Sequence, residues 1–537
     1  MYGTGRSQEN RHAGEQQAIS RWTLFDGALA VLVGAVSMIL YARTLHPHLL
    51  PGDSGEFQVL ARLLGNTHPT GYQVYVVLGH LFTWLPVRDV AYRVNLFSAA
   101  MGALAIIEVY LAGRLLTGRR WPALFAAGVL GLSATFWSQA VIAEVYTCGA
   151  AFLAGVLLAL IYWDRSGHGW ALWIAGLLGG LSIGVHLTVA LSAPAVGLYL
   201  VLKRKEGAKM WRAALLGALV GLVLAVGTFF ALDGRDSPAD FIDIAILPSR
   251  SVWGLDEADL DTSIERLAFS LGGRQWRDRM FSDPARVMPE QIAWYVSNLP
   301  NEFSWIALVL ALVGGVALCR RRSRLAVLLL GSLLAAWLYA FNYEIHDVYV
   351  FHISSYLLLA LLVASGGGSL ADWAASSWRR KGLGRALTAI AVLALCGLGL
   401  VPMLAPRWEA VRDGRVPDFS FSGYPVDERS IIEQLDIQMA IQKLPRDALV
   451  FLNWRHLYPF YYLAHIEGAR ADLVFLEEKP YRAGPQQESS MLQYVQEHIP
   501  DHAVYFSQCL DELTRAGYRC RLVPTRTIRL YRILPAE

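Results

Sequence analysis

Two acidic residues and a histidine near the N-terminus have the types and spacing that chemistry on a hydroxyl group needs. Asp53 and Glu56 stand three positions apart in the stretch GDSGEF, and His68 follows in the stretch HPTGY. A carboxylate can take a proton from a hydroxyl, and a histidine can hydrogen-bond a sugar or a phosphate. The acids directly follow the first long apolar segment, and ionisable groups at a membrane boundary mark a substrate path or a reactive site. They favour chemistry on a lipid-borne substrate.

Each of these residues also has a purely structural interpretation. Asp53 would serve as the N-cap of a helix that begins at Ser54. Glu56, one helical turn after Asp53, would orient either the acceptor or the Asp53 carboxylate. A lone loop histidine such as His68 is often only solvated. Catalysis at Asp53 is favoured over capping, because a cap does not need an acid and Ser54 could provide it.

Polar residues interrupt apolar runs at three further places. Glu144 lies in the stretch IAEVY at the expected outer end of a span, where it either pairs with a cation or contacts the acceptor. His186 separates two short apolar runs, where it would offer a cation to a lipid phosphate or simply face water. Asp347 and Tyr349 interrupt an apolar hairpin, either as donor contacts or as solvated loop residues.

The composition predicts a polytopic membrane protein. Of the 537 residues, 55% are hydrophobic and only 17% are charged, which excludes an ordinary soluble enzyme. The net charge of +3 is too small for this length to indicate nucleic acid, and the cations lie in short clusters between apolar runs. We therefore expect the lipid bilayer as a partner and no nucleic acid.

Apolar windows of near bilayer length recur along the chain and predict about eleven transmembrane helices. They lie at residues 24–42, 93–116, 121–139, 144–163, 170–184, 187–202, 211–232, 303–319, 325–342, 350–369 and 386–404. This number of spans places every cluster of basic loop residues on the cytoplasmic side, together with the N-terminus. It requires residues 72–85 to lie in the interface as a juxtamembrane helix. We expect a multi-pass protein of a bacterial inner membrane or its equivalent.

The same pattern divides the chain into three parts. We expect residues 1–22 to form a cytoplasmic tail, residues 23–405 a transmembrane domain that carries the candidate catalytic residues, and residues 406–537 an extracytoplasmic domain. The outer loops 45–92 and 233–302 belong to the second part.

The last part of the chain has a soluble composition and predicts a small α/β domain. Its strand-like runs lie at 448–452, 473–476, 503–506 and 528–533, and its helical stretches at 427–443 and 489–498. Cys509 and Cys520 lie in it, and in an oxidising compartment they would either pair or stay free.

Three stretches together resemble the GT-C superfamily of polytopic glycosyltransferases, and most closely its protein O-mannosyltransferase-like branch. They are residues 52–82, residues 137–147 with the sequence WSQAVIAEVYT, and residues 449–478. The resemblance implies a mainly helical membrane fold of the GT-C type, with an acid of the first outer loop as the catalytic base. It assigns this role to Asp53, with inversion at the anomeric carbon, and places Glu144 beside it.

The resemblance also implies the other contacts of the site. Relatives carry an acid followed by a tyrosine at the position of Asp347 and Tyr349, and they retain Tyr72. Two departures stand out: Thr70 and Gln73 replace common prolines, which concerns the rigidity of the turn. The run from Trp454 to His456 replaces a more acidic segment, which concerns the acceptor or donor contacts there. We expect these departures to alter substrate choice before activity.

The implied reaction moves a sugar, with mannose as the expected one, from a polyprenyl phosphate to an extracytoplasmic hydroxyl. Protein Ser/Thr is the leading acceptor, and a lipid or a surface glycan is the alternative. No cofactor is required beyond this lipid-linked donor. A divalent cation could bind Asp53 and Glu56, but a monophosphate leaving group can be handled by Arg and His alone. Candidate phosphate ligands in the long outer loop are Arg250, Arg274 and Arg277.

A transporter or flippase would also show many spans and polar breaks. Such proteins are often built from duplicated halves, and neither the GDSGEF nor the HPTGY stretch recurs in the second half of the chain. A transporter also has little need of an exported α/β domain. A glycosyltransferase is therefore the favoured interpretation, ahead of a transporter and of a non-catalytic scaffold.

Overall fold

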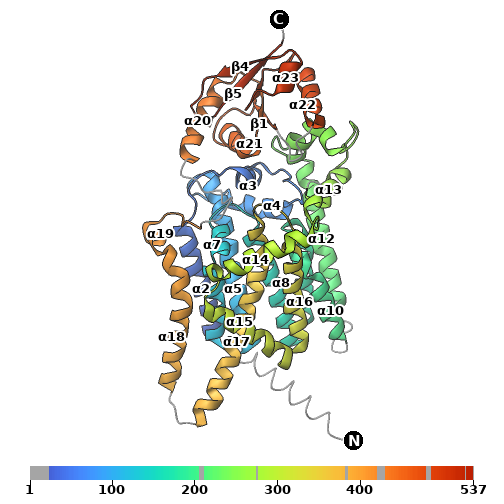
Figure 1. Ribbon diagram of the computed structural model, residues 1–537. Coiled ribbons are helices and arrows are strands. Elements are labelled where there is room, and N and C mark those ends of the chain that lie inside the picture. Colours follow the sequence, from blue (N-terminus) through green and yellow to red (C-terminus); the bar gives the residue numbers. More distant parts are fainter. Residues whose placement is uncertain are drawn as a thin grey trace.

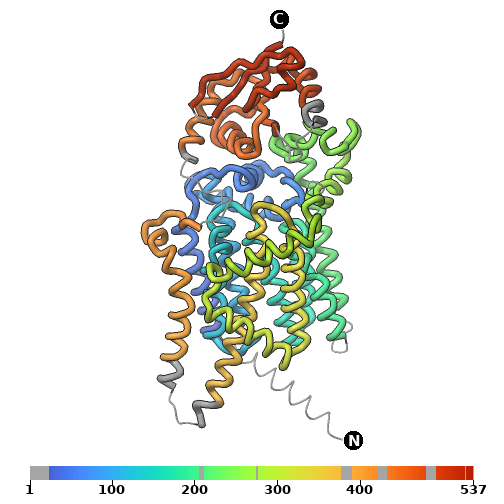
Figure 2. Tube along the Cα trace, viewed as in Figure 1, coloured from blue at the N-terminus to red at the C-terminus, as the bar shows by residue number. Residues whose placement is uncertain are grey.

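The computed structural model describes residues 23–204, 211–273, 276–380, 385–419, 430–478, 485–526 and 528–535. It shows a bundle of long helices with a small mixed domain seated on one end (Figure 1). Figure 2 shows that this domain, drawn in orange and red, comes from the C-terminal part of the chain. The short helices α3 (Gly52–Leu63) and α4 (Gln73–Phe82) lie between the bundle and this domain.

Seven helices in the described part of the chain are long and apolar enough to cross a membrane. They are α2 (Leu24–Arg43), α5 (Val90–Thr117), α8 (Tyr146–Ser166), α12 (Trp211–Asp233), α16 (Ser323–Ala340), α17 (Ile353–Arg380) and α18 (Arg385–Leu404). Two bent pairs raise the number to nine if each pair is one span. These pairs are α6 (Arg120–Leu132) with α7 (Ala134–Ala140), bent by 67°, and α14 (Pro284–Glu302) with α15 (Trp305–Arg321), bent by 114°.

The expected total of about eleven spans is not confirmed. The windows expected at 170–184 and 187–202 form apolar helical segments of fewer than 18 residues, Gly169–Gly184 and Leu187–Leu202. A helix rises 1.5 Å per residue, so each segment is shorter than a hydrocarbon core of about 30 Å. The extended backbone at His186 separates them. Helix α4 is shorter still, in line with an interfacial place for residues 72–85.

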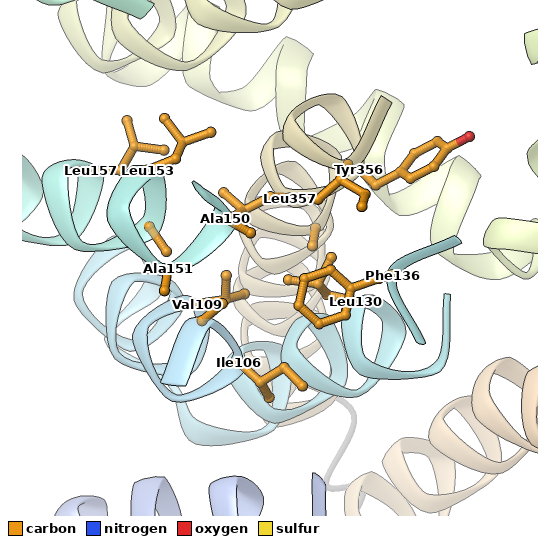
Figure 3. Packing of buried hydrophobic residues seen from close by; sticks show 14 of the residues in the cluster. Ile106, Val109, Leu130, Phe136, Ala150, Ala151, Leu153, Leu157, Tyr356 and Leu357 are labelled. Atoms are coloured by element: carbon orange, nitrogen blue, oxygen red, sulfur yellow. The ribbon is translucent and has the colours of Figure 1, made fainter. Parts of the chain in front are cut away.

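The centre of the bundle is filled by side chains from α5, α6, α7, α8 and α17 (Figure 3). The labelled residues are Ile106, Val109, Leu130, Phe136, Ala150, Ala151, Leu153, Leu157, Tyr356 and Leu357. Ala150 and Ala151 present small side chains, which allows helices to approach closely where lipid offers no hydrophobic driving force. This packed centre supports the helix ends that carry the polar residues.

Helices α9 (Gly169–Leu181) and α12 touch through glycines. A Cβ atom on Gly176 would lie 2.0 Å from the carbonyl oxygen of Ala214, and one on Gly217 would lie 2.1 Å from that of Trp173. Only glycine permits this backbone approach, as in other small-residue helix contacts in membranes. The contact fixes α9, and with it the turn that leads to His186.

The C-terminal domain contains a five-stranded sheet of order β2-β1-β3-β5-β4. Its strands are β1 (Leu449–Leu452), β2 (Val474–Glu477), β3 (Val504–Phe506), β4 (Arg519–Val523) and β5 (Leu530–Leu534). Strands β2, β1 and β3 are parallel, and β5 and β4 continue antiparallel. Helices α20 (Ser430–Lys443), α21 (Trp454–Tyr461) and α22 (Pro485–His498) complete the domain, and α21 faces α3 (Figure 1).

Four expected strands are present, and β4 was missed. Strand β4 is an edge strand that pairs only with β5, and Arg519 and Arg521 are exposed on it. An edge strand can tolerate water on both faces, so its sequence lacks the apolar run that marks a central strand. Cys509 and Cys520, whose pairing was left open, form a disulfide with a Cα–Cα distance of 5.9 Å.

Candidate active site

A cavity of about 1020 Å³ lies between the helix bundle and the C-terminal domain. Segments far apart in the sequence form its wall: the start of α3, the 68–72 turn, the 139–146 turn, the break at 186–191, parts of the long outer loop, the 339–351 hairpin, and α21 with the end of β2. Of the expected site residues, the wall contains Asp53, His68, Tyr72, Glu144, His186, Asp347 and Tyr349. Glu56 is not on the wall.

Asp53 lies in the first turn of α3. The helix begins at Gly52, whose positive φ of 63° suits glycine, and its N-cap is Pro51. Asp53 is therefore not the cap, and it places a negative charge at a helix N-terminus, where such a charge is favoured. Its Oδ1 accepts a hydrogen bond of 2.7 Å from Trp454 Nε1, and its Oδ2 lies 4.0 Å from His68 Nε2. The carboxylate is 43% exposed and accessible from the cavity.

Glu56 is fully buried behind the cavity wall and holds His68. Its carboxylate contacts His68 Nδ1 and accepts hydrogen bonds from the backbone N–H of His68 (2.8 Å) and the hydroxyl of Tyr458 (3.1 Å). Burial by itself lowers the pKa of His68, but the Glu56 and Asp53 carboxylates outweigh it and raise this pKa to about 9. His68 is therefore an imidazolium near neutral pH. Glu56 has no direct access to a substrate, because it is fully buried.

The turn of the HPTGY stretch is closed by a hydrogen bond of 3.0 Å from the N–H of Gly71 to the carbonyl of His68. Tyr72 follows it and stacks on His186, with ring centres 5.8 Å apart and planes 12° apart. His186 Nδ1 accepts from the backbone N–H of Thr188, so its proton lies on Nε2. Burial lowers the pKa of His186 to about 3, which favours a neutral ring over the cation that was one of the two alternatives for this residue.

Glu144 reaches the same cavity from the turn between α7 and α8. Its Oε1 accepts a hydrogen bond of 3.3 Å from Ser54, and its backbone N–H donates to Ser98. Burial, and then the nearby Asp53 and Asp347 carboxylates, raise the pKa of Glu144 well above its usual range. A protonated carboxyl can donate a hydrogen bond to a sugar or phosphate oxygen. Asp347 itself, with a pKa also raised by burial, ends the hairpin beside Tyr349.

Part of the chain matches known proteins in sequence. Residues 53–209 match the family model described as "Protein O-mannosyl-transferase TMEM260 N-terminal domain". "Protein O-mannosyl-transferase tmem260" of Dictyostelium discoideum is 24% identical over 306 residues, which are 53% of this chain and 36% of that protein. The Mus musculus protein of the same name is 36% identical over 135 residues, 25% of this chain and 19% of its own length. The chain thus matches well under half the length of each relative.

The tertiary structure matches solved proteins over nearly the whole chain. ArnT from Cupriavidus metallidurans bound to undecaprenyl phosphate superposes with a TM-score of 0.53 and 14% identity, over 95% of this chain and 98% of ArnT. The protein has the GT-C fold. The expected resemblance to the protein O-mannosyltransferase-like branch is confirmed for residues 53–209, where the family model matches.

Three further residues lie on the cavity wall, two of them in the run from Trp454 to His456 where the sequence had indicated substrate contacts. Trp454, Arg455 and Glu477 come from the C-terminal domain. They follow or end the parallel strands β1 and β2, and side chains at the carboxyl ends of parallel strands meet at one edge of a sheet. That rule is the signal that could have found them. Arg455 also pairs with Glu433 at 3.0 Å.

The long outer loop was expected to supply an arginine as a phosphate ligand, and two of its three candidates lie away from the cavity wall. Arg250 pairs with Asp261 at 3.6 Å, and neither Arg250 nor Arg277 is on the cavity wall. Arg274 lies outside the described residues. Within the ranges that the structure describes, no three His, Cys, Asp or Glu side chains are grouped to hold a metal ion.

Proposed function

We propose that this GT-C protein transfers a sugar from a polyprenyl-phosphate carrier to an extracytoplasmic hydroxyl, with mannose as the sugar and protein Ser/Thr as the acceptor. The observation that carries the proposal is a solvent-accessible carboxylate, Asp53, on the wall of a large cavity and 4.0 Å from a buried imidazolium. The names of the relatives support the choice of sugar and acceptor. The undecaprenyl phosphate in the ArnT structure supports a polyprenyl carrier.

In the proposed reaction the acceptor oxygen attacks the anomeric carbon from the side opposite the phosphate. Asp53 takes the hydroxyl proton as the new carbon–oxygen bond forms. The bond between the anomeric carbon and the phosphate oxygen breaks, and its electron pair leaves with the polyprenyl phosphate. Attack from the opposite side inverts the anomeric configuration. The cavity supplies the alignment that makes such a reaction effectively unimolecular.

The charges on the cavity wall suit a leaving phosphate. His68, whose pKa is raised to about 9, lies between Asp53 and Glu56, and Arg455 adds a guanidinium from the C-terminal domain. Donors that are already in place stabilise developing negative charge without reorganisation. Burial raises the pKa of Glu144, which favours its neutral form and reduces its repulsion of the phosphate.

The test is sugar transfer from a panel of radiolabelled polyprenyl-phosphate sugars to membrane proteins and lipids. Purified wild type is compared with Asp53→Asn at equal expression and thermal stability. We expect wild-type transfer to protein, and a loss of several orders of magnitude in Asp53→Asn because the general base is gone. Full activity in Asp53→Asn would contradict the base, and no transfer from any donor by wild type would contradict the enzyme. Label in lipid alone would contradict the protein acceptor.

A further inference from the structure

The C-terminal domain contacts the acid pair of α3 through two side chains of α21. Trp454 Nε1 donates to Asp53 at 2.7 Å, and the Tyr458 hydroxyl donates to Glu56 at 3.1 Å. Trp454 and Tyr458 are four residues apart on one helix, and Asp53 and Glu56 are three apart on the other, so each pair shares one helix face. Two donors of one domain thus meet two acids of the other.

The local sequence explains why the Trp454 indole lies beside Asp53. Strand β1 is fully buried and ends at Leu452, and Asn453 then caps α21 by accepting a hydrogen bond from the N–H of His456. Trp454 is consequently the first residue of α21, at the carboxyl end of a central strand. Its position is set by the core of the C-terminal domain and not by a mobile loop.

The indole ring is also held in its orientation. Its plane is nearly perpendicular to three neighbouring rings: those of His68 (6.0 Å, 90°), Phe241 (5.8 Å, 82°) and Tyr458 (5.3 Å, 88°). Edge-to-face contacts of this kind are favourable and directional. The N–H vector is therefore fixed toward Asp53, and Oδ1 is occupied while Oδ2 lies on the side of His68.

We infer that Trp454 is a positioning residue for Asp53, so that the C-terminal domain completes the catalytic site. This inference rests on the proposed function. One oxygen of the carboxylate is held by the indole, and the other is left to take the acceptor proton. A base held within a narrow range of orientations reacts faster than one that rotates freely. Loss of the indole N–H should therefore affect turnover rather than binding of the donor.

The test compares purified full-length Trp454→Phe, Trp454→Gln and Tyr461→Phe with wild type. Phe keeps an aromatic ring without the donor, and Gln keeps an N–H donor without the ring. Tyr461 lies on the same helix, but its hydroxyl donates to the carbonyl of Phe475 inside the C-terminal domain, so Tyr461→Phe is the matched control. Each protein is assayed for kcat and for the KM of the donor.

We expect Trp454→Phe to lower kcat by roughly tenfold or more, since a hydrogen bond to a charged group is lost, with donor KM changed by no more than about twofold. Trp454→Gln should retain more turnover than Trp454→Phe, and Tyr461→Phe should resemble wild type. The inference is overturned if Trp454→Phe has wild-type kcat. It is also overturned if Phe retains more activity than Gln, because the ring would then act only by packing.

A second measurement separates this inference from the proposed function. Tm is measured for Trp454→Phe, Asp53→Ala and the double variant. Coupled residues give non-additive effects, so the double variant should lose less than the sum of the two single losses. Additive losses would overturn the inference even if sugar is transferred. If the wild type transfers no sugar, the proposed function fails, and the coupling of Tm still decides whether Trp454 holds Asp53.

Discussion

His68 is the residue whose chemistry depends most on its neighbours. In the sequence it is a loop histidine before a proline, and in the folded protein it lies between the Asp53 and Glu56 carboxylates. Its charge therefore results from contacts made across the 68–72 turn and α3. Glu56, expected to take part in catalysis, is fully buried behind the cavity wall and contacts His68, and its part in catalysis stays a prediction.

The pH dependence of stability should reveal the interaction of His68 with the Asp53 and Glu56 carboxylates. The pKa of His68 is about 9 in the folded protein, against 6.5 for an ordinary histidine. Protonated His68 stabilises the fold fully below pH 6.5, and this contribution is lost as the pH rises through about 9. We expect Tm to fall across this range.

Thermal unfolding of His68→Gln is measured over the same pH range. In this variant most of the decrease in Tm with rising pH should be absent. His168→Gln, at an exposed histidine, should keep the wild-type slope. An unchanged slope in His68→Gln would contradict the assignment of the proton to His68.

At the scale of elements, the cavity is formed by helix ends and breaks. Helix α3 presents Asp53 at its N-terminus, the turn after α7 presents Glu144, and the break after α9 presents His186. Each of these places depends on how tightly the supporting helices pack. The glycines of α9 and α12 bring the backbones of these two helices into direct contact.

Replacement of Gly176 tests this contact. A Cβ atom there would lie 2.0 Å from a backbone oxygen of α12, so Gly176→Ala should force the helices apart. The cost of such overpacking is about 1–3 kcal/mol, measured as a lower Tm together with weaker donor binding. Gly179→Ala is the matched control in the same helix, because no atom lies within 4 Å of its added Cβ. Equal Tm values for the two variants would contradict the close contact.

At the scale of the whole molecule, two parts of the chain share one site. The helix bundle with its outer loops contributes Asp53, Glu144, Asp347 and the histidines, and the C-terminal domain contributes Trp454, Arg455 and Glu477. Sharing requires both parts to meet on the same side of the membrane. The basic clusters, such as Arg320 with Arg321 at the end of α15, predict that this side is extracytoplasmic.

Thiol labelling can test this topology. Cys319 is exposed beside Arg320, and Asp501 is exposed on the C-terminal domain. In right-side-out vesicles, a membrane-impermeant maleimide should label Asp501→Cys in a Cys319→Ser background. Cys319 of the wild type should react several times faster after permeabilisation than before it. Labelling of both sites from outside would contradict the predicted orientation.

The sequence determined the features that depend on local composition. Apolar windows identified the long helices, and strand-like runs identified four of the five strands. Polar breaks in the apolar runs, together with the family resemblance, indicated seven of the residues that lie on the cavity wall. These predictions succeed because hydropathy and strand patterning are properties of consecutive residues. The short segments around His186 show the limit, since apolar character alone does not decide whether a helix crosses a bilayer.

Only the tertiary structure decided which groups act together. Trp454 is 401 positions from Asp53 and forms the hydrogen bond that orients it. Glu56 is hidden behind His68, and His186 is neutral because it is buried. Burial, charge and hydrogen bonding depend on neighbours brought from distant parts of the chain. The sequence by itself therefore determined a membrane protein with a candidate base, and long-range packing determined the charges and the partners of that base.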